Sequence, residues 1–286
     1  MAVVVPRHDF RTDNAPGREP VLDRGTVWAL EDLHKSPQAV ADAMSSSLIL
    51  ARARAAADPA AEWIETWEAW VTAMQSGAAM FAAATTSEES VECRIHHEMR
   101  TVPATGPQPW VDAGNWVTAF WLAVICRDQE RMTDLCQVPV SLLRDSGSVY
   151  DEYIYSWVEA LQLYWLQRQE FGQKLVEAAR GAAPGAAGTA GPELLSKILW
   201  PPIDLFHRFV TGDNERFNDS LADALRWHKE YWTADADRAQ DSDGLVALGP
   251  LAMACFAYDA GFAIEVESEY LPRHLLRRSW AGEFEI

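Results

Sequence analysis

The stretch Asn115-Trp-Val-Thr-Ala-Phe-Trp-Leu-Ala-Val-Ile-Cys-Arg-Asp-Gln-Glu-Arg-Met-Thr-Asp-Leu135 decides the fold class. Its first part is apolar at helical spacing, a short turn follows at Asp128, and a second helix is predicted after the turn. The same form returns in Leu205-Phe-His-Arg-Phe-Val-Thr-Gly-Asp-Asn-Glu-Arg-Phe-Asn-Asp-Ser-Leu221, where Asp213 takes the place of Asp128. Both aspartates are placed to cap the second helix of their pair. Each stretch therefore predicts an αα-hairpin.

A third helix pair is predicted between these two, from Tyr153–Leu166 and Phe171–Ala179. Hairpins of this kind bury a continuous core when they stack, as in TPR-like arrays. The predicted fold class is therefore all-α, with stacked αα-hairpins in a TPR-like helical array. One exception is a short β-hairpin near residues 90–103, where Val91, Cys93 and Ile95 alternate with charged residues.

The chain divides into three predicted parts. Residues 1–24 contain three prolines and no periodicity, which predicts a poorly ordered N-terminal arm. Helices and the β-hairpin are expected over residues 25–110, and the helical-hairpin array over residues 111–286. We expect these last two parts to form one continuous globular unit.

Proline and glycine mark the predicted boundaries within the helical part. Ser36-Pro37 and Asp58-Pro59 have the form of an N-cap followed by proline in the first turn, so each predicts a helix start. Trp200-Pro-Pro202 is expected to interrupt a helix, because proline cannot donate a backbone hydrogen bond. The Gly/Ala/Pro-rich segment Ala182–Gly191 is expected to be a mobile surface loop. After Asp58, a helical aromatic stripe is expected to lie in the core: Trp63, Trp67, Trp70 and Met74.

Charge is the most informative bulk property. Of the 286 residues, 42 are acidic and 24 basic, which gives a formal net charge of −18. Such a field repels nucleic acid and anionic membranes and speeds the encounter with a basic partner. Solubility alone is the alternative explanation. No apolar run approaches the length of a membrane span, and the short apolar N-terminus does not resemble a signal peptide, so the expected compartment is the cytoplasm.

The motifs of common catalytic sites are missing from the sequence. It contains no phosphate-binding glycine loop, no nucleophile elbow and no zinc-protease motif, and its four cysteines form no Cys-x-x-Cys pair. The spacings Glu31-x-x-His34 and Asp204-x-x-His207 occur in helical di-iron proteins, but core packing explains His207 equally well. We therefore expect no catalytic residue, no metal and no cofactor.

Two groups of residues are candidate sites. The first consists of acidic residues near the C-terminus, expected to bind a protein partner or else to form a solvated surface: Asp235, Asp237, Asp241, Asp243, Glu265, Glu267 and Glu269. The second would form an acid/base cluster or ligand pocket between helical hairpins: Asp151, Glu152, Tyr153 and His228. The alternative for the second group is that its charges favour the helix ends at which they lie.

Six motifs occur in order along most of the chain: Pro103-Ala-Thr-Gly-Pro107, Ala113-Gly-Asn-Trp-Val-Thr-Ala-Phe-Trp-Leu-Ala-Val-Ile-Cys-Arg-Asp128, Tyr150-Asp-Glu-Tyr153, His228-Lys-Glu-Tyr-Trp-Thr-Ala-Asp235, Gly244-Leu-Val-Ala-Leu-Gly-Pro-Leu-Ala252 and Glu267-Ser-Glu-Tyr-Leu-Pro-Arg-His-Leu275. Together they resemble the immunity protein 49 family. The resemblance runs from about Ala41 to Phe284. It implies an all-α antidote of a bacterial polymorphic toxin system, encoded beside a secreted toxin. It carries over no catalytic residues.

The predicted function is stoichiometric occlusion of a cognate protein toxin by an acidic, aromatic-containing helical surface. If the toxin is a nuclease with a basic active site, acidic residues would mimic the phosphate backbone. An enzyme or ligand-binding protein of small-molecule metabolism is the alternative, and a TPR-like peptide scaffold is a third. Toxin occlusion predicts an acidic patch, a role in small-molecule metabolism predicts a deep apolar pocket with a few polar groups, and a peptide scaffold predicts a long concave groove.

Overall fold

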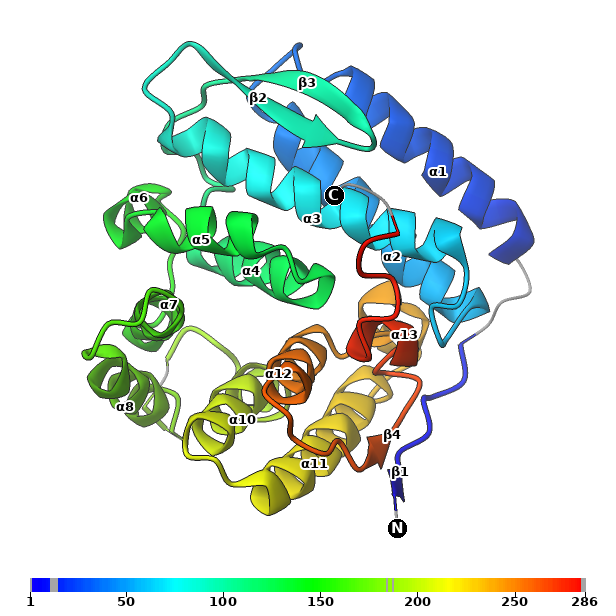
Figure 1. Ribbon diagram of the computed structural model, residues 1–286, viewed down its shortest axis with the longest axis vertical. Helices are drawn as coiled ribbons and strands as arrows, with labels where there is room; N and C mark the ends of the chain where they lie inside the picture. The colour runs from blue at the N-terminus through cyan, green and yellow to red at the C-terminus, as the bar shows by residue number, and fades with distance from the viewer. Residues whose placement is uncertain (1, 11–14, 184, 187, 284–286) are drawn as a thin grey trace.

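The computed structural model describes residues 2–10, 15–183, 185–186 and 188–283, with the backbone alone for residues 15–19. Over these residues the fold is all-α apart from two short strand pairs, as predicted. The first helices lie side by side, and the β-hairpin packs along the last of them (Figure 1). These elements are α1 (Ala15–Glu31), α2 (Ala39–Ala57), α3 (Ile64–Thr85), β2 (Ser90–Ile95) and β3 (Glu98–Pro103).

Helix pairs form the rest of the fold. The three predicted αα-hairpins are present as α4–α5, α7–α8 and α10–α11, and the chain then returns through α12 to the centre of the molecule (Figure 1). The TPR-like repeat itself stays a prediction. The bounds are α4 (Ala113–Cys126), α5 (Gln129–Gln137), α6 (Val140–Asp145), α7 (Glu152–Trp165), α8 (Phe171–Gly181), α9 (Pro192–Leu194), α10 (Trp200–Val210), α11 (Asn214–Trp232), α12 (Leu248–Asp259) and α13 (Arg273–Leu276).

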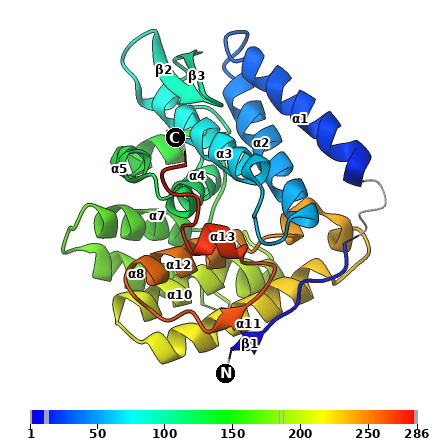
Figure 2. The same ribbon diagram turned by 45° about the vertical axis from the view of Figure 1, so that its right-hand side comes forward.

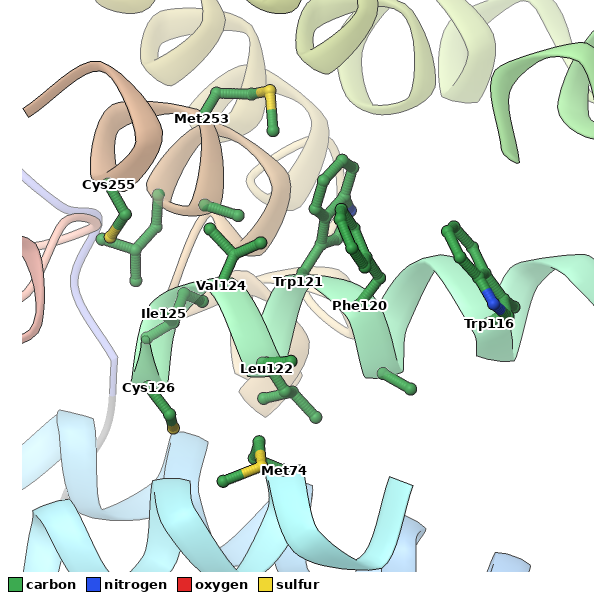
Figure 3. Close-up of a cluster of buried hydrophobic side chains, with 14 of the residues drawn as sticks. Met74, Trp116, Phe120, Trp121, Leu122, Val124, Ile125, Cys126, Met253 and Cys255 are labelled. Carbon is green, nitrogen blue, oxygen red and sulfur yellow. The ribbon is translucent and has the colours of Figure 1, made fainter. Parts of the chain in front are cut away.

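The core is centred on α4, which lies between α3 and α12. Trp116, Phe120 and Trp121 of α4 are at most 4% exposed, and the Trp116 and Phe120 rings stack with centroids 5.1 Å apart. Figure 3 shows Met74 of α3 on one side of this helix and Met253 of α12 on the other. Because α4 and α12 are apolar on almost every face, both must be enclosed by other helices. The long apolar run in the sequence is explained by this central position.

The same left-handed turn ends the first helix of each pair. Arg127 (φ 59°), Gln167 (φ 56°) and Gly212 (φ 72°) follow α4, α7 and α10. In each case the next backbone N–H donates to the carbonyl five residues earlier, which is the Schellman motif. As predicted, the carboxylates of Asp128 and Asp213 then accept from the backbone N–H groups of the second helix.

Arg127 occupies a left-handed position that glycine usually fills. The cost of this backbone conformation is offset by the guanidinium of Arg127, which joins three elements at the end of α4. It donates to the carbonyls of Ile125, Leu275 and Leu276 at 2.7–2.8 Å and pairs with Asp259 at 3.0 Å. This side chain, 7% exposed, fastens α13 and α12 to α4.

Several predicted boundaries were wrong. Helix α1 begins at Ala15, ten residues before Gly25, and runs through Pro20. Helix α2 begins after Gln38, which makes no side-chain cap, so Ser36-Pro37 is not its start. The carboxylate of Asp58 accepts from the backbone of Glu62 and Trp63 in a turn that precedes α3, so Asp58 does not cap the helix directly. Residues that commonly cap helices occur in these turns, but no helix begins at them.

The N-terminal segment is docked, contrary to the predicted loose arm. The strand β1 (Val3–Val4) pairs in parallel with β4 (Val266–Glu267), and Val5 is 3% exposed. The imidazole of His8 lies 2.7 Å from the hydroxyl of Tyr270. Residues 1 and 11–14 of the predicted arm lie outside the described residues.

The segment before α10 also differs from its prediction. Residues Leu195–Leu199 form a π-helical turn that leads directly into α10, with Pro201 and Pro202 in the first turn of α10. Because a π turn shifts the hydrogen-bond pattern, the helix continues past two residues that cannot donate. The predicted interruption is therefore a change of helix type. Trp63, expected in the core, is 49% exposed because it precedes α3, whereas Trp67 and Trp70 are buried.

Candidate functional site

The predicted acidic residues lie on two segments near the C-terminal half of the fold. One is the connector between α11 and α12, which contains the short 3-10 turns Arg238–Gln240 and Ser242–Gly244. The other is the strand β4 and its flanks, which lie beside β1 and α11 at one end of the molecule (Figure 2).

The β4 segment presents a row of carboxylates. Glu265, Glu267 and Glu269 are exposed, while Val266 and Tyr270 between and after them are buried. This alternation places Glu265 and Glu267 on one face of the extended segment, and Glu269 lies in the turn that follows it, over residues 268–271. None of the three makes an ion pair among the described residues, so no cation of the fold offsets the carboxylates of this row at the surface.

The connector carboxylates are mostly engaged within the protein. Asp235 pairs with Arg238 at 3.3 Å, and Asp241 accepts from the backbone N–H of Asp243 at 2.9 Å. Asp243 pairs closely with Arg52 of α2, whose side chain is 13% exposed. Asp237 is exposed. The structure thus separates the two acidic groups: the β4 row faces solvent, and the connector is tied back to the fold.

A cavity of 570 Å³ lies between α4, α7, α10, α11 and α12. Its walls are mainly apolar and aromatic and include Trp121, Ile154, Trp157, Leu199 and Trp232. Arg52 and Asp243 also line it. Burial lowers the pKa of Arg52 and raises that of Asp243, while their mutual attraction opposes both changes. This is a deep apolar pocket with a few polar groups.

The predicted acid/base cluster is only partly brought together. Asp151, Tyr153 and His228 line the cavity, whereas Glu152 forms an exposed ion pair with Arg144. The carboxylate of Asp151 accepts from the backbone N–H groups of residues 188–190, which lowers its pKa. This anchor ties down the described part of the predicted mobile loop, whose residues 184 and 187 lie outside the described residues.

Burial sets the protonation of the other two cluster members. It raises the pKa of Tyr153 to about 12, and it lowers that of His228 to about 4, where the nearby charges of His8 and Arg52 add to the effect and a hydrogen bond with Gly244 opposes it. At neutral pH the phenol is protonated and the imidazole is neutral. Neither pKa lies near 7, where a general acid or base is most effective. At these pKa values neither group exchanges a proton readily at neutral pH, and the acid/base role stays a prediction.

A second hollow, a groove of 930 Å³, was not predicted from the sequence. It is bounded by the C-terminal part of α3, by β2, by α5 and by the start of α6. Four exposed carboxylates line it: Glu92, Glu130, Asp134 and Asp145. Arg94 and Arg131 line it as well, and Arg131 pairs with Asp128. The groove is assembled from two segments, residues 75–94 and 130–145, which are distant from each other in the sequence, so no local pattern marks it.

No metal-binding group of three or more His, Cys, Asp or Glu side chains occurs in the part of the chain that the structure describes. Glu31 and His34 are exposed, and the carboxylate of Asp204 binds the hydroxyl of Ser220 at 2.6 Å. His207 is exposed rather than packed beside its phenylalanine neighbours, so the expected packing role was also wrong. All four cysteines are free, and burial raises their pKa values.

No helix among the described residues is long and apolar enough to cross a membrane. A family model described as "Immunity protein 49" matches residues 58–275 of the chain. No curated protein and no solved structure matches it.

Proposed function

Since the chain belongs to the immunity protein 49 family, we propose that it binds a cognate bacterial toxin in a stoichiometric complex and blocks the toxin by covering its active site. The family match over residues 58–275 carries this proposal. The protein would act as a binder in the cytoplasm and would catalyse no reaction. Its role requires a preformed surface that is complementary to the toxin.

The proposed contact surface is the β4 row, with the connector residues beside it. Glu265, Glu267 and Glu269 are exposed and free of ion pairs among the described residues, so they are available to a basic partner. Asp235, Asp237, Asp241 and Asp243 would add to the negative field, although three of them are also held by the fold. Aromatic anchors are supported by the exposure of Trp227 on α11, which is 37% exposed.

The net charge of the chain supports a positively charged site on the toxin as the surface that it covers. The net charge of −18 speeds association with a positive surface and opposes binding to nucleic acid or anionic membranes. A toxin that acts on nucleic acid has such a positive surface, and a row of carboxylates spaced along an extended segment would take the place of phosphates. Complex formation should therefore weaken as salt is added.

Co-expression with the toxin encoded beside the gene tests the proposal. The wild-type chain should protect the host cell and form a 1:1 complex. A triple variant, Glu265→Lys, Glu267→Lys and Glu269→Lys, should bind at least about 100-fold more weakly, because like charges across an interface cost several kcal/mol. The matched control carries three lysines in the groove, at Glu92, Glu130 and Asp134, and should protect like the wild type.

One result would contradict the neutralising function, and another would contradict only the proposed contact surface. If the wild-type chain neither protects nor binds the toxin, the neutralising function is wrong. If the wild type protects but the β4 variant does so equally well, and the groove variant does not, the function stands and the contact surface is the groove. Circular dichroism of each variant separates loss of binding from loss of fold.

A further inference from the structure

The cavity between the helix pairs has the dimensions of a small-molecule site. Its volume of 570 Å³ falls within the range of about 300–1,000 Å³ that is typical of ligand pockets. Trp121 of α4, Trp157 of α7 and Trp232 of α11 contribute aromatic surface to its walls. Such walls would hold the apolar body of a ligand.

Arg52 contributes an unusual polar group to this wall. Its Nη1 donates to Asp243, but its Nε is buried without a hydrogen-bond partner, and its Nη2 makes no hydrogen bond with any described residue. The N–H of Nε and one N–H of Nη2 point the same way along one edge of the planar guanidinium. This edge is the fork that a carboxylate binds with both oxygens. On Arg52 it is unused.

A second unpaired donor lines the same cavity. The indole Nε1 of Trp232 is buried and makes no hydrogen bond within the described part of the chain. A buried donor without an acceptor is destabilising, so such groups usually mark a missing partner. The charged acceptors of the wall are already engaged, Asp243 by Arg52 and Asp151 by the 188–190 backbone. The cavity therefore offers unpaired donors, whereas both carboxylates of its wall are already engaged.

We propose that this cavity binds a small carboxylate with an aromatic or aliphatic body. The carboxylate lies against the Nε–Nη2 edge of Arg52, and the apolar body packs on the tryptophan-lined wall. Arg52 and Trp232 both line the cavity, and side-chain rearrangements of the kind that accompany binding would expose the buried Nε and indole N–H groups to the ligand. Arg52 keeps its contact with Asp243, so the guanidinium bridges the ligand and the connector.

The shape of the wall is held by close backbone approaches. A Cβ added at Gly249 of α12 would lie 2.6 Å from Cγ of Pro202 in α10, and one at Gly114 would lie 2.6 Å from the hydroxyl of Tyr150. Both glycines line the cavity. The close approach of the Pro202 ring to Gly249 holds α10 and α12 together on this wall, so the rearrangement that binding requires is confined to side chains.

Isothermal titration calorimetry on the purified full chain tests the site without any toxin. The probes are 1-naphthylacetate, decanoate and 1-naphthaleneacetamide, the uncharged counterpart of the first. The carboxylates should bind 1:1, and the amide at least about tenfold more weakly, because it lacks the charge that strengthens the bidentate contact. Arg52→Lys keeps the charge but loses the fork, and should weaken carboxylate binding at least about tenfold.

Two further variants complete the test. Val117→Trp places a larger side chain on the cavity wall and should abolish binding. Arg54→Lys is the matched control, because Arg54 lies on the same helix, pairs with Asp23 and does not line the cavity, so binding should be unchanged. Thermal unfolding of each variant shows that it is folded.

The proposal is overturned if neither carboxylate binds at millimolar concentration, if the amide binds as well as 1-naphthylacetate, or if Arg52→Lys binds like the wild type. These results leave toxin neutralisation untouched, because that function is tested in a separate complex. Loss of toxin binding with intact carboxylate binding would likewise affect only the proposed function.

Discussion

Protonation of one buried histidine should make the fold sensitive to mild acid. The His228 ring is 6% exposed, its Nε2 lies 3.0 Å from the carbonyl oxygen of Gly244, and the ring packs edge-on against Tyr270 with centroids 4.9 Å apart. Burial, together with the positive charges of His8 and Arg52, lowers its pKa from 6.5 to about 4. Between these pH values the unfolded chain binds a proton that the folded chain does not, so stability falls as the pH falls.

The size of this effect follows from the two pKa values. The difference between 6.5 and about 4, at about 1.36 kcal/mol for each pH unit, corresponds to about 3 kcal/mol of unfolding free energy. This contribution is fully present above pH 6.5 and is lost progressively as the pH falls to about 4. It is an appreciable fraction of the roughly 5–15 kcal/mol that stabilises a typical domain.

Urea unfolding of the wild type and of His228→Gln measures this contribution directly. Glutamine retains a group that can hydrogen bond to Gly244 but takes up no proton. Carboxylates and His8 titrate in both proteins, so the difference in unfolding free energy between them isolates His228. Between about pH 7 and about pH 4, the wild type should lose about 3 kcal/mol more unfolding free energy than His228→Gln loses. A difference that stays constant over this range would refute the assignment of a depressed pKa to His228.

Four other substitutions have clear expected outcomes. Arg127→Ala leaves Asp259 and three carbonyls without their donor, and urea unfolding should show a loss of about 3–5 kcal/mol. Gly249→Ala forces a Cβ against Pro202 and should lower stability by about 1–3 kcal/mol in thermal unfolding, whereas Gly172→Ala, which meets nothing within 4 Å in α8, should be neutral or slightly stabilising. Asp151→Ala frees the backbone N–H groups of residues 188–190, so hydrogen exchange there should accelerate while global stability changes by less than about 1 kcal/mol.

The helical architecture was predictable because its signals are local. Apolar spacing in α4 and α10 and the capping aspartates Asp128 and Asp213 fix two hairpins from a few adjacent residues. The alternation of residues 90–103 similarly specified the β-hairpin. The residue that adopts the left-handed conformation in each turn was harder to predict from the sequence. Gly212 is a conventional choice, but Arg127 takes this position because its side chain reaches carbonyls about 150 residues away in the chain.

The wrong boundaries share a physical cause. Proline and capping residues show where a backbone hydrogen bond is missing, but they do not show how the fold compensates. Helix α1 continues through Pro20, and a π turn before α10 accommodates Pro201 and Pro202. Asp58 caps a turn that lies several residues before α3. In each case the chain satisfies or omits the affected hydrogen bonds in a way that proline and capping residues alone do not specify.

The candidate sites were harder to predict because they depend on distant contacts. The Arg52–Asp243 pair joins residues 191 positions apart, and no periodicity marks either one. The sequence grouped Asp243 with the surface carboxylates, but its partner places it at the cavity wall, whereas Glu267 remains on the exposed face of β4. The connector therefore has two sides: its outer carboxylates face solvent, and its inner end pairs with a largely buried guanidinium. Substitutions at Asp243 are expected to affect folding and the cavity, so the proposed docking surface is better tested by changes along the β4 row.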